Sequence, residues 1–278
     1  MDGPCFSMLS SFKDLINHAL DSCQVMRVDY ADIRIVRRQR EKIATKDGVI
    51  EALKMSESLG FGIRILKNGA WGFAASNILT LEEIEKIVKQ AMVIAEASAR
   101  VPGRKIVFSN TRSVTAKYRT PVKIHPFKVP LSKKIDLLLA ADKAQRISDK
   151  IKISQSFYRG FWEEKIFAST EGSYIEQEII ECGAGIEATA IDEQEVQNRS
   201  YPNSFRGQSS TAGYEIIKEM NLTENAPRIG SEAVSLLTAK QCPSGKVDII
   251  LDGNQLALQV HESCGHAVEL DRVLGMEA

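Results

Sequence analysis

This chain of 278 residues has no long hydrophobic run, although 44% of its residues are hydrophobic. Nothing approaches the roughly 18 consecutive apolar residues that a membrane-spanning helix needs. The first eleven residues also lack the basic start and long apolar core of a secretory signal peptide. We therefore expect no membrane partner, a cytoplasmic location, and a globular protein with a sizeable core.

Cysteine is scarce, and its spacing shows no pairing. The chain has five cysteines, which is an odd number, and none of them belongs to a Cys-x-x-Cys pair. This pattern favours free thiols in a reducing compartment and disfavours a structural zinc ribbon. The five are Cys5, Cys23, Cys182, Cys242 and Cys264.

A net charge is also missing, because 36 basic residues balance 36 acidic ones. No whole-molecule field therefore steers the chain toward nucleic acid. One local basic cluster exists, but few aromatic residues accompany it, so it is more typical of the solvated face of a strand pair than of a phosphate-binding track. We expect no nucleic-acid partner. The cluster comprises Arg34, Arg37, Arg38, Arg40 and Lys42.

The hydrophobic pattern predicts an α+β fold in which helices pack on antiparallel β-sheets. Apolar residues recur at helical spacing from 6 to 23, and the period then changes to short β-rich runs from 32 to 75. Turn signals at 46–48, 58–60 and 67–69 divide those runs into an expected meander of about four or five strands.

A capping box at Thr80 begins a helix that extends to about residue 100, and a proline-rich connection follows it. One short extended piece is expected near 105–108. The order of helix and then β-rich block is repeated, and shorter helices follow. The expected ranges are 132–147 for the helix, 151–201 for a β-rich block that turns at Thr170–Ser173, and 211–220 and 231–240 for the later helices.

This repeated order predicts two related helix-plus-meander halves, followed by the start of a third, incomplete C-terminal domain. In that last segment we expect a strand over 246–251 and then a helix capped by the turn at 252–254. The predicted divisions are 1–102 for the N-terminal half, 103–130 for the connection, 131–241 for the second half and 242–278 for the start of the third domain.

Half of the four histidines lie in the run HESCGH at 261–266. His261 and His266 offer two imidazoles and Glu262 a carboxylate, the set with which zinc hydrolases hold a metal and take a proton from water. In the familiar His-Glu-x-x-His motif the histidines are four apart, whereas here a regular helix leaves the two rings about 140° apart. A single π-type turn reduces that offset to about 50°. Gly265 would ease the distortion.

The alternative is a helix that carries two unrelated histidines, one facing solvent and one buried, and the spacing alone leaves both interpretations open. A strand that leads into a capped helix would give His261 the rigid platform that a metal ligand needs. Glu269 and Asp271, just beyond, either orient a histidine N–H or are ordinary exposed helix acids. Cys264, three residues after His261, is a competing ligand.

Two glycine-aromatic segments and one turn carry a resemblance to a known family over nearly the whole chain. The segments are GFGIRIL at 60–66 and GAWGFAA at 69–75, and the turn is STEG at 169–172. Together with the histidine run they resemble the TldD/PmbA metallopeptidases, and the five-residue histidine spacing matches TldD-type subunits. PmbA-type partners lack the metal motif. Taken alone, the glycines indicate tight strand packing rather than cofactor binding.

The resemblance implies that His261 and His266 are zinc ligands and that Glu262 is the catalytic general base. It implies a zinc-dependent peptidase, assembled as a homodimer or as a heterodimer with a PmbA-type subunit. In the family that this chain resembles, the third protein ligand is a cysteine far downstream. This sequence ends at Ala278, whereas family members continue for roughly another domain, so we expect an incomplete, C-terminally truncated site.

Two hypotheses about function follow. The favoured one is a peptidase subunit that hydrolyses peptides or unfolded protein segments, because a sheet edge can bind extended peptides through backbone hydrogen bonds. The alternative is a catalytically inactive fragment that acts as an interaction or scaffold partner. The sequence does not identify the substrate-binding side chains. A DNA-associated function, which the family's older description as gyrase modulators suggests, is disfavoured by the zero net charge and by the lack of a recognisable reading helix.

Overall fold

The computed structural model describes residues 12–101, 103, 105–107 and 112–277. The strands are β1 Tyr30–Lys46, β2 Val49–Lys67, β3 Ala70–Ser76, β4 Thr115–Arg119, β5 Ile151–Ser169, β6 Tyr174–Ile191, β7 Val196–Tyr201 and β8 Gln208–Ser210. The α-helices are α1 Lys13–Val25, α2 Leu81–Ser98, α3 Leu131–Gln145, α4 Glu215–Glu219, α5 Leu222–Leu236, α6 Gly253–Val260 and α7 Leu270–Val273.

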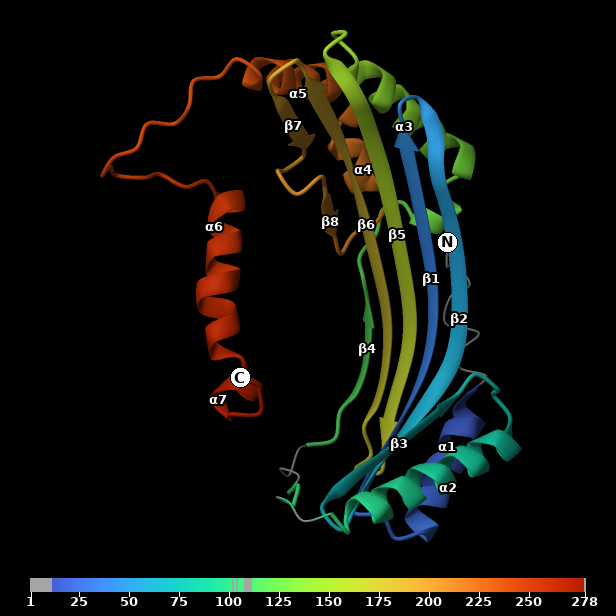
Figure 1. The fold of residues 1–278 in the computed structure, drawn as a ribbon. Helices are drawn as coiled ribbons and strands as arrows, with labels where there is room; N and C mark the ends of the chain where they lie inside the picture. Colours follow the sequence, from blue (N-terminus) through green and yellow to red (C-terminus); the bar gives the residue numbers. More distant parts are fainter. Residues whose placement is uncertain (1–11, 102, 104, 108–111, 278) are drawn as a thin grey trace.

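One curved sheet of eight strands runs the length of the molecule, with α1 and α2 at one end and α3 to α5 at the other (Figure 1). Its strand order is β3-β2-β1-β5-β6-β4, and β7 and β8 also pair with β6. The strand pairs are antiparallel except for β4, which lies parallel to β6. The predicted α+β class with helices on an antiparallel sheet is confirmed.

The first β-rich block forms three strands rather than four or five. The turns at 46–48 and 67–69 are confirmed, and each has two successive residues at positive φ, as tight hairpins require. The turn at 58–60 is wrong, because Gly60 lies inside β2. A Cβ on Gly60 would lie 2.9 Å from the carbonyl oxygen of Ser76, so this glycine permits close approach of the chain leaving β3.

The helices of the first half begin and end close to where the pattern places them. Thr80 caps α2, and its Oγ1 accepts a hydrogen bond from the N–H of Glu83 at 3.3 Å, as the capping box predicted. The described part of the first helix runs over Lys13–Val25, whereas we expected 6–23, and residues 6–11 lie outside the described part of the chain.

The hairpin at Thr170–Ser173 is confirmed between β5 and β6, with Gly172 at a φ of 88°. The connection before α3 holds β4, which the sequence did not predict. Its backbone pairs in register with the start of β6. The extended piece expected near 105–108 is not a strand over 105–107, and residue 108 lies outside the described part.

The last helix of the second half is longer than predicted. It begins at Leu222 instead of near 231, because Pro227 and Gly230 lie inside it and do not end it. A Cβ on Gly230 would lie 2.2 Å from the carbonyl oxygen of Gln145, so glycine lets α5 approach the end of α3. The helix expected at 211–220 is the shorter α4.

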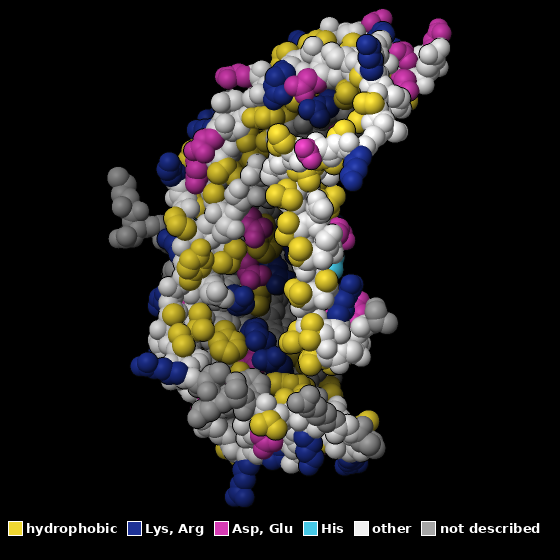
Figure 2. Space-filling model, turned by 90° about the vertical axis from the view of Figure 1, so that its left-hand side faces the viewer, with side chains coloured by type: hydrophobic (Ala, Val, Ile, Leu, Met, Phe, Trp, Pro, Cys, Tyr) yellow, Lys and Arg dark blue, Asp and Glu magenta, His cyan; other side chains and the backbone are white. Residues whose placement is uncertain are grey.

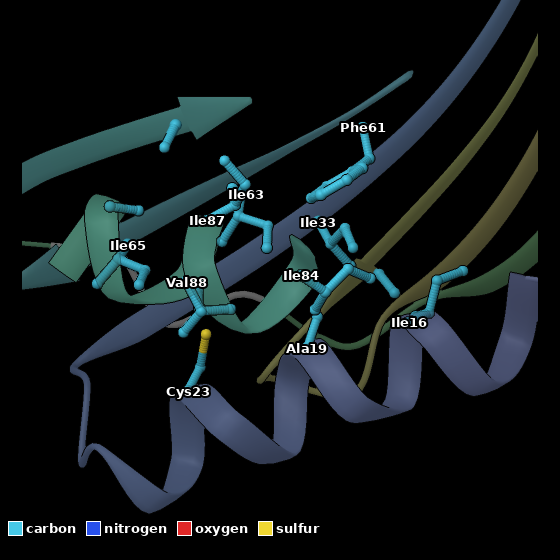
Figure 3. Packing of buried hydrophobic residues seen from close by; sticks show 14 of the residues in the cluster. Ile16, Ala19, Cys23, Ile33, Phe61, Ile63, Ile65, Ile84, Ile87 and Val88 are labelled. Atoms are coloured by element: carbon cyan, nitrogen blue, oxygen red, sulfur yellow. The ribbon is translucent and has the colours of Figure 1, made fainter. Parts of the chain in front are cut away.

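Two hydrophobic clusters share the sheet. In the first, α1 and α2 pack their buried side chains on β1, β2 and β3, as Figure 3 shows for Cys23, Val88 and Ile65. In the second, α3, α4 and α5 pack on β1, β5 and β6. Strand β1 contributes to both, through Ile33 near one end and Ile43 near the other. The two halves therefore form one continuous sheet.

Between the clusters, the same face of the sheet carries charged and aromatic side chains. Arg37 forms ion pairs with Glu57 at 2.7 Å and Glu164 at 3.7 Å, and its guanidinium lies 5.3 Å from the ring centre of Trp162. Trp162 Nε1 donates to Glu178 at 3.1 Å. Burial raises the pKa of Glu164, and the positive charge of Arg37 opposes that shift.

The C-terminal segment differs most from expectation. The strand predicted over 246–251 is wrong: these residues are irregular, and within the described chain no strand pairs with them. Val247 and Ile249 are each 73% exposed. An extended segment without a neighbour cannot satisfy its backbone hydrogen bonds as a sheet does. The division of the chain into the four ranges given above stays a prediction.

Among the residues that the structure describes, no helix combines the length and the apolar character needed to cross a bilayer.

We predict that Gly72→Ala destabilises the first half of the molecule. A Cβ on Gly72 of β3 would lie 2.0 Å from the backbone oxygen of Ala91 in α2, so the helix would have to move off the sheet. Overpacking of this kind costs about 1–3 kcal/mol, and urea unfolding at equilibrium measures it. The matched control is Gly253→Ala, where an added Cβ meets nothing within 4 Å. Equal losses in the two variants would contradict the prediction.

A second prediction concerns pH. His125 lies edge-on to Trp162 with ring centres 5.5 Å apart, and its Nδ1 accepts from the N–H of Phe127 at 3.3 Å. Its Nε2 is buried and has no hydrogen-bond partner among the residues that the structure describes. Burial lowers the pKa of His125 below its ordinary value, while the negative charge of Glu178 opposes this. The folded protein therefore binds fewer protons than the unfolded chain just below pH 6.5.

Stability should accordingly fall as the pH drops through the unfolded-state pKa of histidine and level off below the folded-state pKa. Unfolding free energies measured in urea between pH 5 and 7.5 test this. His125→Asn keeps an acceptor for the N–H of Phe127 but has no titrating ring, so its stability should change less over that interval. An unchanged pH dependence in the variant would show that other groups cause it.

Candidate metal centre

Helix α6 carries the histidine run at its C-terminal end. Asp252 caps its start, and its Oδ1 accepts from the N–H of Gln255 at 3.0 Å, so the predicted cap is confirmed. None of the eight residues of α6 is buried. The platform expected for His261 is therefore only half present, because the helix forms and the strand before it does not.

The turn that follows α6 has the π geometry that the metal-site interpretation of the spacing required. His261–Gly265 is a single π-helical turn, and the N–H of His266 donates to the carbonyl of His261, five residues earlier. This brings the two rings onto one side, with centres 4.5 Å apart and planes at 80°. A regular helix would have separated them by about 140°. The alternative of one buried and one solvent-facing histidine does not occur, because neither ring is buried.

Gly265 has no special part in this turn. Its backbone is in the ordinary right-handed region, with φ −63° and ψ −57°. A Cβ added there would make only an ordinary contact, 3.7 Å from the carbonyl oxygen of Val260. The expectation that glycine eases the distortion is therefore wrong.

The turn gathers three candidate ligands. One ligand atom each from His261, Glu262 and His266 lies within 4.8 Å of the others. Glu262 Oε2 is 4.0 Å from His266 Nε2, and the carboxylate side chain is 61% exposed. Imidazole nitrogens and a carboxylate oxygen are donors that zinc accepts, so the residues fit a zinc site. Within the described chain this group contains no third histidine or cysteine, and catalytic zinc sites usually have three protein ligands.

Cys264 does not join this group, although it lies within the same turn. It is a free, exposed thiol. At three residues after His261 it would share a face with that histidine on an α-helix, but the wider π turn changes this angular relation. The structure therefore does not support Cys264 as the competing ligand.

Glu269 orients one of the two histidines. Its Oε1 lies 3.0 Å from His266 Nδ1, and Arg272 Nε lies 3.4 Å from its other oxygen. With Nδ1 engaged, Nε2 of His266 is the nitrogen nearer Glu262. Asp271 instead accepts a hydrogen bond from the N–H of Arg272. Arg272 was not among the residues predicted to belong to the site, and its i,i+3 spacing from Glu269 is the pattern that indicates the contact.

The surroundings of the turn are apolar and open. Exposed apolar side chains flank it on both sides along the chain, among them Val260 at 50% and Val268 at 72%. Figure 2 looks from the side on which α6 lies in Figure 1, and it shows an elongated hollow bordered by hydrophobic side chains, with acidic and basic side chains inside it. In addition, a polar cavity of about 550 Å³ lies between the start of α6, β7 and α5.

Comparison with protein families gives two matches along the chain. Residues 31–95 match a family model described as PmbA/TldA metallopeptidase domain 1, and residues 124–241 match one described as PmbA/TldA metallopeptidase central domain. The candidate ligands at 261–266 lie outside both matched ranges, so these family models do not bear on them.

Among curated proteins, the chain is similar to metalloprotease MJ0996 of Methanocaldococcus jannaschii, with 34% identity over 246 residues. That alignment covers 88% of this chain and 53% of the relative. The chain therefore spans about half the length of the curated relatives it matches.

Solved structures share the fold. A protein described as a modulator of a DNA gyrase from Thermotoga maritima superposes with a TM-score of 0.64 at 18% identity, covering 84% of this chain and 50% of its own. TldE from Thermococcus kodakarensis gives 0.53 at 16% identity, covering 81% of this chain and 46% of its own. At these identities the likeness shows the fold alone.

We predict that Glu269→Ala weakens zinc binding by about 10–100-fold, because a histidine that loses its orienting acceptor is a poorer ligand. Competition with a chromophoric zinc chelator measures the affinity. Asp271→Ala is the matched control, since this neighbouring acid does not contact His266. Equal affinities for the Glu269 variant and the unmodified protein would refute the orienting role.

Proposed function

Because this chain belongs to the TldD/PmbA metallopeptidase family, we propose that it provides part of a zinc-dependent peptidase that hydrolyses peptides or unfolded protein segments. The observation that supports this most directly is the π turn that places His261 beside His266 and Glu262. Since the chain spans about half of its relatives, the proposal concerns a partial site.

In this proposal His261 and His266 hold the metal, and a cysteine from outside the cluster is the third protein ligand. When bound, zinc lowers the pKa of a coordinated water to about 7 and polarises a carbonyl. Glu262 accepts a proton from the attacking water and delivers it to the leaving amine. The exposed carboxylate supports this role, because both water and a peptide can reach it. Glu269 holds His266 in one orientation.

The substrate is proposed to be an extended peptide. Between residues 49 and 60, β2 pairs with β1 on one side, and within the described chain no strand pairs with its other side. Such an edge can bind a peptide through backbone hydrogen bonds with little dependence on sequence. We therefore expect modest sequence selectivity.

The proposed assembly is a homodimer or a heterodimer with a PmbA-type subunit. This assembly is what the family resemblance implies, and the solved structure named TldE shows that the fold is shared. We place the protein in the cytoplasm. The four cysteines in the described chain are free, and burial raises the pKa of two of them, Cys23 to about 12 and Cys182 to about 11, so these thiols are unreactive.

The second candidate function is a catalytically inactive scaffold. The observation that favours it is the small ligand set: with Glu262 acting as the base, only the two imidazoles remain as ligands in this group, whereas catalytic zinc sites usually have three protein ligands and an open position. Zinc analysis of the purified chain separates the two proposals. A stoichiometric, firmly held ion supports the peptidase, whereas a substoichiometric and easily stripped ion supports the scaffold.

We predict that Glu262→Gln abolishes peptide hydrolysis and leaves the zinc content unchanged, because the amide is nearly isosteric but cannot accept a proton. Losing a general base typically lowers the rate by about 10²–10⁴-fold. Cleavage of an unstructured fluorogenic peptide and metal analysis are measured on the same samples. Glu219→Gln, an exposed acid on α4, is the control. Full activity in the Glu262 variant would refute its role as base.

A further inference from the structure

A cavity of about 560 Å³ is lined by residues of α3, α4 and the first turn of α5. These helices lie at one end of the sheet (Figure 1). None of the residues that line the cavity belongs to the C-terminal segment that carries the candidate metal centre. The volume is in the range of about 300–1,000 Å³ that is typical of small-molecule sites. The cavity is therefore a separate candidate for ligand binding.

Its floor is apolar and held by the second hydrophobic cluster. Tyr214, Ile217 and Leu222 line it and are 5%, 2% and 1% exposed, so they are fixed by the packing beneath them. Ile124 and Leu137 add apolar walls. A preformed apolar floor of this kind binds a hydrocarbon group without first having to order its own side chains.

Its rim is positively charged. Lys128, Lys133 and Lys218 line the cavity, are exposed, and form no ion pair with any residue in the described part of the chain. Glu224 is the one acidic residue in the lining. The acid next to Ile124 is Glu215, and its carboxylate is already engaged, because it accepts backbone N–H groups from Lys123, Ile124 and Gly213.

The backbone adds to this positive potential. Pro130 and Asn221, the residues that precede α3 and α5, both line the cavity, and neither gives its helix a side-chain cap. The first-turn N–H groups of two helices therefore lie near the same opening, with the positive ends of the helix dipoles. The cavity thus combines an apolar floor with a cationic rim.

We propose that this cavity binds a monocarboxylate that carries an apolar group, with the apolar group on the floor and the carboxylate at the three lysines. A free fatty acid and the C-terminal residue of an apolar peptide share this chemistry. Exposed ion pairs contribute little on their own, so the apolar contact supplies most of the affinity and the lysines select for the negative charge. This site does not depend on the peptidase proposal.

The test is isothermal titration calorimetry of the full chain with octanoate and with octanol. We expect octanoate to bind at least tenfold more tightly than octanol, because only the acid can use the lysine rim. The triple variant Lys128→Gln, Lys133→Gln and Lys218→Gln should lose that preference and leave octanol binding unchanged. A matched triple variant of exposed lysines elsewhere, at Lys13, Lys42 and Lys89, should bind both ligands as the unmodified protein does.

Acetyl-leucyl-leucine, with a free or an amidated C-terminus, distinguishes the two sources of the ligand. Tighter binding of the free dipeptide than of octanoate assigns the site to peptide C-termini, and the reverse order assigns it to fatty acids. Equal affinity for octanoate and octanol would overturn the proposal, as would undiminished octanoate binding by the rim variant. Because the readout is binding, a failed peptidase assay leaves these outcomes unaffected.

Discussion

The antiparallel pairing of β1 with β5 is the constraint on which the rest of the fold depends. These strands pair from Asp32 opposite Ser169 to Lys46 opposite Gln155. Each strand also begins the hairpin of its own half, with β2 and β6 respectively. The helices of both halves must therefore pack on one sheet. Because β1 and β5 are long enough to pass under both clusters, these strands set the distance between the two groups of helices.

Strands of this length also leave a stretch of sheet between the two clusters that no helix of the described chain covers. The sheet places charge there in complementary pairs. At the border of the second cluster, Lys134 and Glu41 form a buried ion pair, and the lysine also lies 5.0 Å from the ring centre of Tyr158. A buried charge without its partner is strongly destabilising, so these groups tie the register of β1 to the position of α3.

The candidate metal centre obeys a different rule, because it depends on local backbone geometry rather than on packing. One hydrogen bond, from His266 to the carbonyl of His261, widens a single turn and brings two imidazoles together on a helix with no buried residue. Contacts within the same short segment, from Glu269 and Arg272, then fix one ring. Within the described chain the site thus has local order, but no buried residue of α6 anchors it as catalytic groups are usually anchored.

What the sequence by itself determined was local. The capping box at Thr80 and the hairpin turns with glycine or asparagine at positive φ depend on neighbours within a few residues, so their pattern could be read directly. The π turn is equally local, but the spacing of His261 and His266 left it as one of two interpretations.

Only the tertiary structure decided the rest. Gly60 carries a turn signal but lies in a strand, where the absence of a side chain lets a backbone distant in sequence approach closely. Helix α5 continues through Pro227 and Gly230 because it packs against α3. Residues 246–251 have a strand pattern but no partner in the described chain. Pairing and close approach join residues far apart in sequence, and such contacts leave no fixed spacing for a local pattern to reveal.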